Sequence, residues 1–428
     1  MKKTDKKYPA YIQILKEELL PATGCTEPIA LAYAAAKAKE VLGSMPERVH
    51  IDASGSIIKN VKSVVVPNTD GLKGIPAAAA AGIVAGKADQ KLEVIASVTP
   101  QQIEEINTFL ENTTIDVEHV ENDLTFEIAV TLYAGEAYSR VRIANHHTNI
   151  VHIEKNGQVL FDIEVHDNAE EGLTDRTLLD MKSILDFANT VDIEDIREII
   201  GRQISCNMAI SEEGFQKNYG ANIGSVLLKA DGDGIRIRAK ARAAAGSDAR
   251  MNGCEMPVII NSGSGNQGMT CSLPVIEYAK ELKVTEEKLY RALVLSNLVT
   301  IHEKTGIGRL SAFCGAVCAG AAAGAGIAYL HDADFETIAH TVINALAIDS
   351  GIICDGAKSS CAAKIASAVD AGILGYHMCI NGQNFYPGDG IVTEDVDETI
   401  KNVGILGREG MKQTNDKIIE IMIHNPCH

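Results

Sequence analysis

The sequence contains no tryptophan, and phenylalanine and tyrosine together bring its aromatic content to only 4%. A core for 428 residues must therefore be filled by aliphatic and small side chains, and apolar residues make up 46% of the chain. Small side chains let helices approach one another closely, so we expect tightly packed helices rich in alanine and glycine. The apolar and charged fractions, 46% and 22%, are those of a globular protein and exclude disordered and fibrous classes.

Positive charge is also scarce, because 39 lysines and arginines stand against 57 acidic residues and leave a net charge of −18. Phosphate groups would be repelled by such a chain. We therefore expect neither nucleic acid nor a membrane surface as a partner, and a small amino-acid substrate is the better hypothesis. A homodimer is left open.

The first twenty residues lack the apolar segment of a secretory signal, so we expect a cytoplasmic protein. Its ten cysteines would be kept reduced there, which favours metal binding or catalysis over disulfides. The longest uncharged run, Leu310 to Leu330, consists mostly of alanine, glycine, serine and cysteine. These side chains gain little on entering lipid, so we interpret the run as a buried helix.

The hydrophobic pattern predicts an α+β protein with a large Ala/Gly-rich helical domain and a smaller, mainly antiparallel α+β domain. Two N-terminal helices over residues 1–46 are expected to pack on the helical domain. Alternating β-branched runs fill residues 47–166, where Asn156-Gly157 predicts a tight hairpin. Helical spacing then continues through residues 167–428, and we expect the catalytic groups in the glycine-rich loops of this part.

The motif ThrGlyCysThrGluPro at residues 23–28 interrupts the two N-terminal helices. Pro28 fits the first turn of the second helix, which places Cys25 and Thr26 at a helix N-terminus. The helix dipole and the free N–H groups there should lower the pKa of the Cys25 thiol. Glu27 is in the same turn and is either a second candidate base or a carboxylate that stabilises the dipole.

Cys314, Cys354 and Cys361 stand near glycine-marked breaks in the helical half. Forty residues separate the first pair and seven the second, which is wider than in zinc ribbons or ferredoxin motifs. Spacing alone therefore leaves two interpretations open, small buried thiols or the ligands of one metal cluster. Asp355 and Lys358 lie between two of these cysteines and are either functional or solvated loop charges.

A flexible segment at residues 259–274 carries SerGlySerGlyAsnGlnGly and then enters a helix. Backbone N–H groups in such a position can bind a carboxylate or phosphate. The segment lacks the glycine spacings of dinucleotide and P-loop sites, so a nucleotide site is not supported.

Together the motifs at 23–28, 262–268 and 354–361 resemble the L-cysteine desulfidase family, which is related to the iron-sulfur L-serine dehydratases. The resemblance implies a 4Fe-4S cluster and a catalytic cysteine in the N-terminal motif. Serine dehydratases are expected to carry a Ser/His-rich motif in place of residues 23–27 and a longer second cysteine gap, which favours the desulfidase branch. Carried over residue by residue, the implied site consists of the catalytic residue Cys25, the cluster ligands Cys314, Cys354 and Cys361, and the substrate-binding residues Thr26, Ser262, Gly263, Ser264 and Asn266.

The activity implied is β-elimination of sulfide from L-cysteine, which yields pyruvate, ammonia and hydrogen sulfide. Three alternatives stay open: L-serine dehydration by the same cluster, a pyridoxal phosphate enzyme with Lys358 or Lys304 as Schiff base, and a non-catalytic amino-acid-binding protein. His146, His147 and His152 are predicted to serve in a turn and on a strand face rather than as metal ligands. Cys427 is near the end of the chain and is interpreted as part of a disordered tail.

Overall fold

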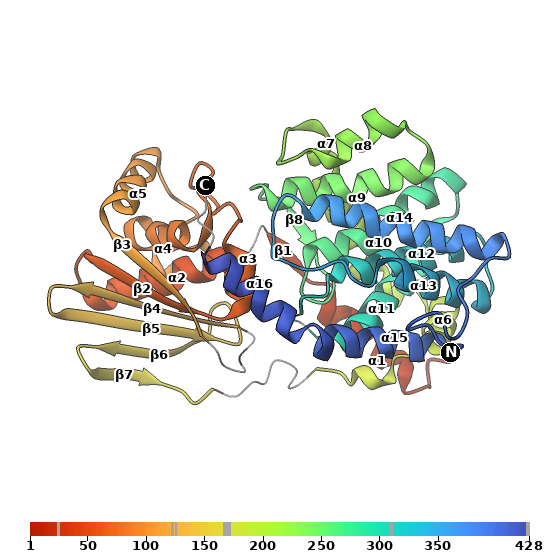
Figure 1. Cartoon of the computed structure of the whole chain (residues 1–428), viewed down its shortest axis with the longest axis horizontal. Coiled ribbons are helices and arrows are strands. Elements are labelled where there is room, and N and C mark those ends of the chain that lie inside the picture. The colour runs from red at the N-terminus through yellow and green to blue at the C-terminus, as the bar shows by residue number, and fades with distance from the viewer. Residues whose placement is uncertain (24–25, 121–123, 125, 166–172, 309–310, 425–428) are drawn as a thin grey trace.

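The computed structural model describes residues 1–23, 26–120, 124, 126–165, 173–308 and 311–424. It has two parts that lie side by side, a helical part and a part built on a sheet (Figure 1). Each part has its own hydrophobic core. The expected α+β class, with a larger helical region and a small mixed sheet, is confirmed.

The helical part consists of α1 and of most elements after residue 173. Its N-terminal strand β1 (Pro21–Thr23) pairs antiparallel with β8 (Pro257–Ile259). Its helices are α1 (Lys7–Glu18), η2 (Arg176–Leu178), α6 (Met181–Thr190), α7 (Ile193–Gln216), α8 (Ile223–Asp231), α9 (Ile235–Met251), α10 (Gly265–Leu282), α11 (Glu286–Ile307), α12 (Gly315–Leu330), α13 (Phe335–Asp349), α14 (Cys361–Ile380), α15 (Val396–Ile405) and η3 (Leu406–Gly410). The last helix, α16 (Lys412–His424), leaves this part and packs on the sheet part, whose core includes its Ile419.

Local sequence explains where several of these helices begin. The side chain of Asp180 accepts a hydrogen bond from the N–H of Ser183 at 2.8 Å and so caps α6. Asp334 does the same for α13 through the N–H of Thr337 at 2.9 Å. A capping carboxylate satisfies an N–H group that the first helical turn leaves free, and its charge suits the positive end of the helix.

Glycines allow α12 and α14 to cross at very short range. A Cβ atom at Gly372 would come 2.1 Å from the carbonyl oxygen of Gly320, and one at Gly324 would come 2.5 Å from the carbonyl oxygen of Gly372. Neither backbone could stay in place beside a larger residue. The uncharged run predicted as a buried helix is helical from Gly315 to Leu330, which form α12, and almost all residues of α12 are buried. Among the described residues, no helix is both long enough and apolar enough to cross a membrane.

The sheet part contains six strands in the order β3-β2-β4-β5-β6-β7. β2 and β3 are parallel and the other neighbours are antiparallel, so the expectation of a mainly antiparallel sheet is correct. The strands are β2 (Arg48–Ala53), β3 (Thr114–His119), β4 (Glu127–Ala134), β5 (Ala137–Ala144), β6 (Ile150–Lys155) and β7 (Gln158–Asp162). The helical elements of this part are α2 (Thr26–Leu42), α3 (Gly55–Val61), α4 (Gly74–Ala85), η1 (Ala88–Glu93) and α5 (Pro100–Asn112).

The predicted hairpin at Asn156-Gly157 joins β6 to β7. Both residues have positive φ, 51° and 82°, as a two-residue type I′ turn requires. Asn156 also accepts a hydrogen bond from the N–H of Tyr138 at 2.8 Å, which ties the turn to β5.

The expected packing of residues 1–46 on the helical domain needs a correction at α2. Tyr11, Ile14 and Leu15 of α1 do belong to the core of the helical part. The buried alanines of α2 instead belong to the core of the sheet part, where α2 packs against α4, β4 and β5. Gly82 of α4 permits this close packing, because a Cβ atom there would come 2.1 Å from the carbonyl oxygen of Ala32. The break at residues 23–28 therefore lies where the chain passes from one part to the other.

Candidate functional site

One cavity between the two parts brings together residues that are far apart in the sequence. Glu27 and Asn60 line it from the sheet part, and the rest of its wall comes from loops and helix ends of the helical part. Predicted site residues in this wall are Cys314, Cys354, Cys361, Ser262, Gly263, Ser264 and Asn266. Cys25 and Cys427 lie outside the described residues.

Backbone pairing brings the cysteine loops together across their forty-residue separation. Phe313 and Ile353 form an antiparallel bridge. The N–H of Cys314 donates to the carbonyl of Ile352 at 3.0 Å, and the N–H of Cys354 donates to the carbonyl of Ala312 at 2.6 Å. Cys314 is the N-cap residue of α12, and α14 begins at Cys361. All three thiols therefore stand at loop ends or helix starts that face one cavity.

The three thiols are half-buried beside one another and interact electrostatically. The Cys314 thiol donates a hydrogen bond to Cys354, which holds the pKa of Cys354 well below its usual value against the effect of burial. The positive charges of Lys59 and Lys304 lower it further. Burial raises the pKa of Cys361. Cys354 is thus the thiol of this group that most readily becomes a thiolate, the form that binds metals.

Two buried lysines stand beside these thiols. Lys59 is 3% exposed, and its ammonium group donates to the carbonyl of Ser311 at 3.1 Å and to Asn415 Oδ1 at 2.9 Å. Lys304 is 7% exposed and donates to the carbonyl of Gly308. Burial lowers the pKa of both ammonium groups, while Cys354 and Cys314 act in the opposite direction. Two buried cations of this kind suit a group that becomes anionic when thiolates bind metal.

The chemistry of the donor set fits an iron-sulfur cluster. Three thiols in one cavity are the ligand type of iron-sulfur clusters, and each ligand of a cubane binds a separate iron. Among the described residues, the sulfur atoms of these three cysteines do not all lie within 4.8 Å of one another.

The glycine loop makes another wall of the cavity. Ser262 and Gly263 have positive φ, 49° and 78°, and Ser264 caps α10 by accepting from the N–H of Gln267 at 3.4 Å. Gly268 lets α10 lie against the preceding strand, since a Cβ there would come 2.0 Å from the carbonyl oxygen of Ile259. The loop therefore presents the N-terminus of α10 to the cavity.

Residues of the N-terminal motif meet a histidine of the sheet part. Glu27 lines the cavity and accepts a hydrogen bond from Asn60 Nδ2 at 3.3 Å. Thr26 does not line the cavity, and its Oγ1 lies 3.0 Å from His147 Nε2 and donates to Glu27 Oε2 at 3.5 Å. His147 also packs edge-on against Phe126, with ring centroids 4.7 Å apart. Thr26 thus positions Glu27 rather than forming the wall itself.

Asp355 and Lys358, the charges between two of the cysteines, pair with each other, and Lys364 pairs with the same carboxylate. They hold the loop between Cys354 and α14. Neither residue lines the cavity.

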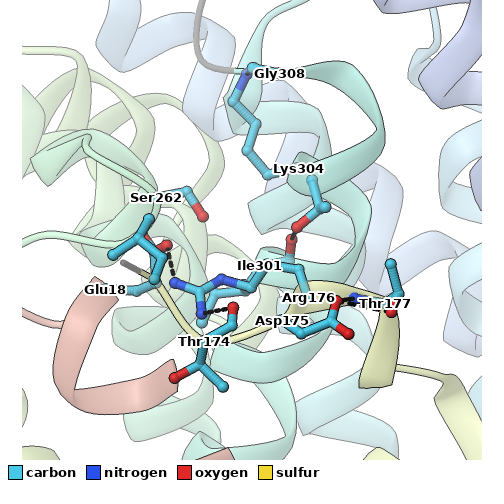
Figure 2. A pocket seen from close by; sticks show the side chains of 11 residues that line it. Glu18, Thr174, Asp175, Arg176, Thr177, Ser262, Ile301, Lys304 and Gly308 are labelled. Carbon is cyan, nitrogen blue, oxygen red and sulfur yellow. Dashed lines mark hydrogen bonds and ion pairs between the residues drawn. The ribbon is translucent and has the colours of Figure 1, made fainter. Parts of the chain in front are cut away.

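A second cavity of 250 Å³ adjoins the first and shares Ser262 and Lys304 with it (Figure 2). Arg176 crosses its floor and pairs with Glu17 and Glu18 at 2.7 Å each. Because both carboxylates already neutralise this arginine, the second cavity has no free guanidinium to offer a ligand.

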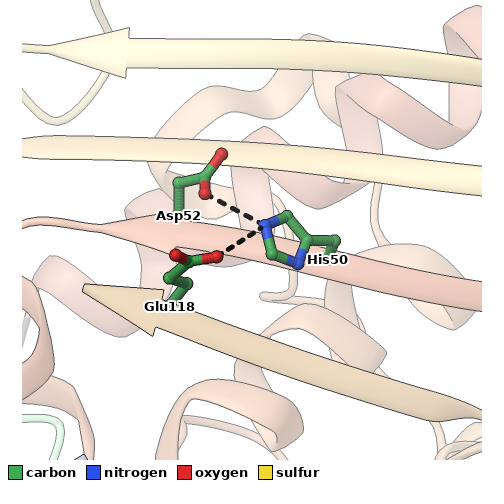
Figure 3. A group of neighbouring side chains, drawn as sticks. All are labelled: His50, Asp52 and Glu118. Carbon is green, nitrogen blue, oxygen red and sulfur yellow. Dashed lines mark hydrogen bonds and ion pairs between the residues drawn. The ribbon is translucent and has the colours of Figure 1, made fainter. Parts of the chain in front are cut away.

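His50, Asp52 and Glu118 form a separate group on the neighbouring strands β2 and β3 (Figure 3). His50 Nε2 lies 3.0 Å from Asp52 and 3.7 Å from Glu118. Arg140 pairs with the other oxygen of Asp52 at 2.7 Å. We interpret the group as an ion-pair network on the sheet.

Sequence reasoning missed several residues of the site. Lys59, Asn60 and Arg250 carry no motif signal, because each depends on a neighbour from a distant segment. Gln267 belongs to the glycine motif at 262–268, but the motif does not show that its side chain lines the cavity. His147 had a signal, the His146-His147 pair, which we interpreted as a turn.

The chain is similar to known proteins over most of its length. The chain matches the model of the serine dehydratase alpha chain over residues 89–420, which include both cysteine loops and the glycine loop. A UPF0597 protein of Desulfitobacterium hafniense is 60% identical over 427 residues, which cover 100% of this chain and 99% of the relative. UPF0597 proteins of Lachnoclostridium phytofermentans and Treponema denticola are 53% and 45% identical, each over 97% of this chain and over 100% and 98% of their own length.

Proposed function

The chain belongs to the serine dehydratase alpha-chain family, and from that premise we propose that it removes sulfide from L-cysteine by β-elimination. Pyruvate, ammonia and hydrogen sulfide would be the products. The observation that supports the proposal most is that Cys314, Cys354 and Cys361 line one cavity together with Glu27 and the glycine loop.

The three cysteines are the proposed ligands of a 4Fe-4S cluster, and Lys59 and Lys304 would offset its negative charge. When bound through three cysteines, such a cluster supplies an iron without a protein ligand, a Lewis acid to which the leaving sulfur can bind. The short second cysteine gap and the ThrGlyCysThrGlu motif favour a thiol substrate over serine.

The protein's own residues have to take the α-proton. We assign this role to Cys25. Glu27 is the alternative, because it lines the cavity and is held by Asn60 and Thr26. As the base takes the proton, the electrons of the Cα–H bond form the Cα–Cβ double bond and the Cβ–S bond breaks with its electron pair on sulfur. The aminoacrylate that is released tautomerises to an imine, and water hydrolyses it to pyruvate and ammonia.

Binding of the substrate falls to the loop of Ser262, Gly263, Ser264 and Asn266. The N-terminus of α10 favours negative charge, so the α-carboxylate is the part of the substrate that suits this wall. The three thiols line the same cavity, and the side chain of the substrate would then face them.

The test is analysis of iron and acid-labile sulfide in protein purified without oxygen, followed by pyruvate assays with L-cysteine and L-serine. We expect both elements in the purified protein and faster pyruvate formation from L-cysteine. Protein without iron or labile sulfide that still forms pyruvate would overturn the proposed cofactor, and absorption of an aldimine would point to pyridoxal phosphate instead.

L-Serine dehydration is the second candidate, because the matching family model is that of a serine dehydratase. In that case a hydroxyl group leaves instead of a thiolate. Pyruvate from L-serine at a higher kcat/KM than from L-cysteine would establish this candidate in place of the first. Ligand-induced stabilisation without any turnover would indicate a binding protein.

A further inference from the structure

We propose that Arg250 binds the α-carboxylate of the substrate and that the side-chain oxygens of Asn266 and Gln267 accept hydrogen bonds from its α-ammonium group. This inference deepens the proposed function and rests on it. It assigns the site to free α-amino acids in their zwitterionic form.

Arg250 lies in the last turn of α9 and lines the cavity. Its Nε atom is inaccessible to solvent and has no hydrogen-bond partner. The guanidinium of Arg250 packs directly against Gly265, because a Cβ atom at Gly265 would come 2.5 Å from Arg250 Nε. Glycine at the start of α10 thus leaves the space in which Arg250 stands.

The electrostatics of this position call for an anion. Arg250 stands at the N-terminus of α10, where the helix dipole is positive. Within the part of the chain that the structure describes, no carboxylate lies within ion-pair distance of it, whereas Arg236, Arg238 and Arg242 of the same helix are all paired. An unpaired cation next to a positive helix end is unfavourable until an anion binds between them. A carboxylate satisfies both and fits a guanidinium in bidentate geometry.

Two residues that line the same cavity have side-chain acceptor atoms without a donor. Gln267 is 6% exposed, and its Oε1 has no hydrogen-bond partner. The amide of Gln267 packs against Gly315, because a Cβ atom at Gly315 would come 2.6 Å from Gln267 Oε1. The amide therefore lies between the glycine loop and the Cys314 loop. Asn266 Oδ1 is also unpartnered, while its Nδ2 lies 3.5 Å from Met251 Sδ. Unsatisfied buried acceptors are costly, and an ammonium group offers three donors to them.

These donors and acceptors match both charged groups of an amino acid. The guanidinium takes the carboxylate, the two amide oxygens take the ammonium, and the side chain is left to face the thiols, which line the same cavity. A thiol that lacks either charged group should lose the corresponding contacts.

The experiment compares three thiols on the anaerobically purified enzyme: L-cysteine, cysteamine, which lacks the carboxylate, and 3-mercaptopropionate, which lacks the amine. KM is measured for L-cysteine, and inhibition constants and ligand-induced thermal stabilisation are measured for the two analogues. We expect Arg250→Gln to weaken L-cysteine and 3-mercaptopropionate by about 10- to 100-fold and to leave cysteamine unchanged, because a charge-assisted contact is lost. Gln267→Met should weaken L-cysteine and cysteamine and spare 3-mercaptopropionate.

Arg242→Gln is the matched control, since Arg242 is on the same helix and pairs with Glu212 at 3.0 Å. It should change none of the three ligands, and Arg250→Lys should restore part of the lost affinity. If Arg250→Gln weakens all three thiols by the same factor, or none of them, the assignment is wrong. Failure of the proposed function has a different signature: neither L-cysteine nor L-serine is turned over, while Arg250-dependent stabilisation by either amino acid can still be measured.

Discussion

His147 Nε2 lies 3.0 Å from Thr26 Oγ1, although 121 residues separate the two in the sequence. The contact connects the loop after β5 to the first residue of α2. Through the hydroxyl of Thr26 it reaches Glu27, which lines the cysteine cavity. His147 therefore acts as a positioning residue for the N-terminal motif.

Replacing His147 by phenylalanine should lower kcat by about 10- to 100-fold, because Thr26 loses its partner and Glu27 its support. The iron content and KM should change little. His147→Gln, which can still hydrogen-bond to Thr26, should recover part of the rate. The exposed neighbour His146 provides the control, and His146→Phe should be almost silent. A matching loss in both variants would contradict the role of His147.

The same histidine should make the protein sensitive to acid. Burial lowers the pKa of His147, with Glu27 acting in the opposite direction and His146 in the same one. Below about pH 6.5 the unfolded chain takes up a proton that the folded state resists, so the free energy of unfolding falls as the pH falls. Melting temperatures between pH 8 and 5 should drop less steeply in His147→Gln than in the wild type. Equal slopes would show that another group is responsible.

Loss of any one proposed ligand should remove the cluster. We expect Cys314→Ser, Cys354→Ser and Cys361→Ser each to lose most of their iron and labile sulfide, and the melting temperature to fall because a ligand of the native state is gone. Cys379→Ser is the control, since Cys379 is on α14 but outside the cavity. Full iron content in any of the first three variants would exclude that residue as a ligand.

Glu303 should destabilise the protein as the pH rises. It is 2% exposed, and burial raises its pKa well above the usual value, although a hydrogen bond with Cys318 acts in the opposite direction. Above about pH 4.5 the unfolded chain releases a proton that the folded state keeps, so the free energy of unfolding falls as the pH rises. Glu303→Gln should therefore gain about 1–3 kcal/mol at pH 8 and little at pH 4.5. Denaturant unfolding at the two pH values measures this difference, and an equal change at both would contradict it.

The close crossing of α12 and α14 should not tolerate a methyl group. Gly372→Ala would place its Cβ 2.1 Å from the carbonyl oxygen of Gly320, and overpacking of this kind costs about 1–3 kcal/mol. Ser367→Ala changes an exposed position of the same helix and should stay within about 0.5 kcal/mol of the wild type. Differential scanning calorimetry separates the two, and equal melting temperatures would show that the helices can move apart.

Features that depend on near neighbours were predictable from the sequence. The Asn156-Gly157 turn, the alternating strands on either side of it and the Ala/Gly-rich helices all follow from local backbone preferences and from the spacing of apolar residues. The net charge, which does not depend on the fold, also favoured a small-molecule ligand over nucleic acid or a membrane surface.

Only the tertiary structure decided which distant residues meet. Cys314 and Cys354 stand together because Phe313 pairs with Ile353, and no spacing rule predicts that bridge. The same holds for α2, which packs on the sheet part, where its apolar face is buried and Gly82 of α4 leaves room for its backbone. Arg250 carries no signal in the sequence, and the motif that contains Gln267 does not indicate the role of its amide, since whether a buried charge or amide has a partner depends on contacts between chain segments that only folding brings together.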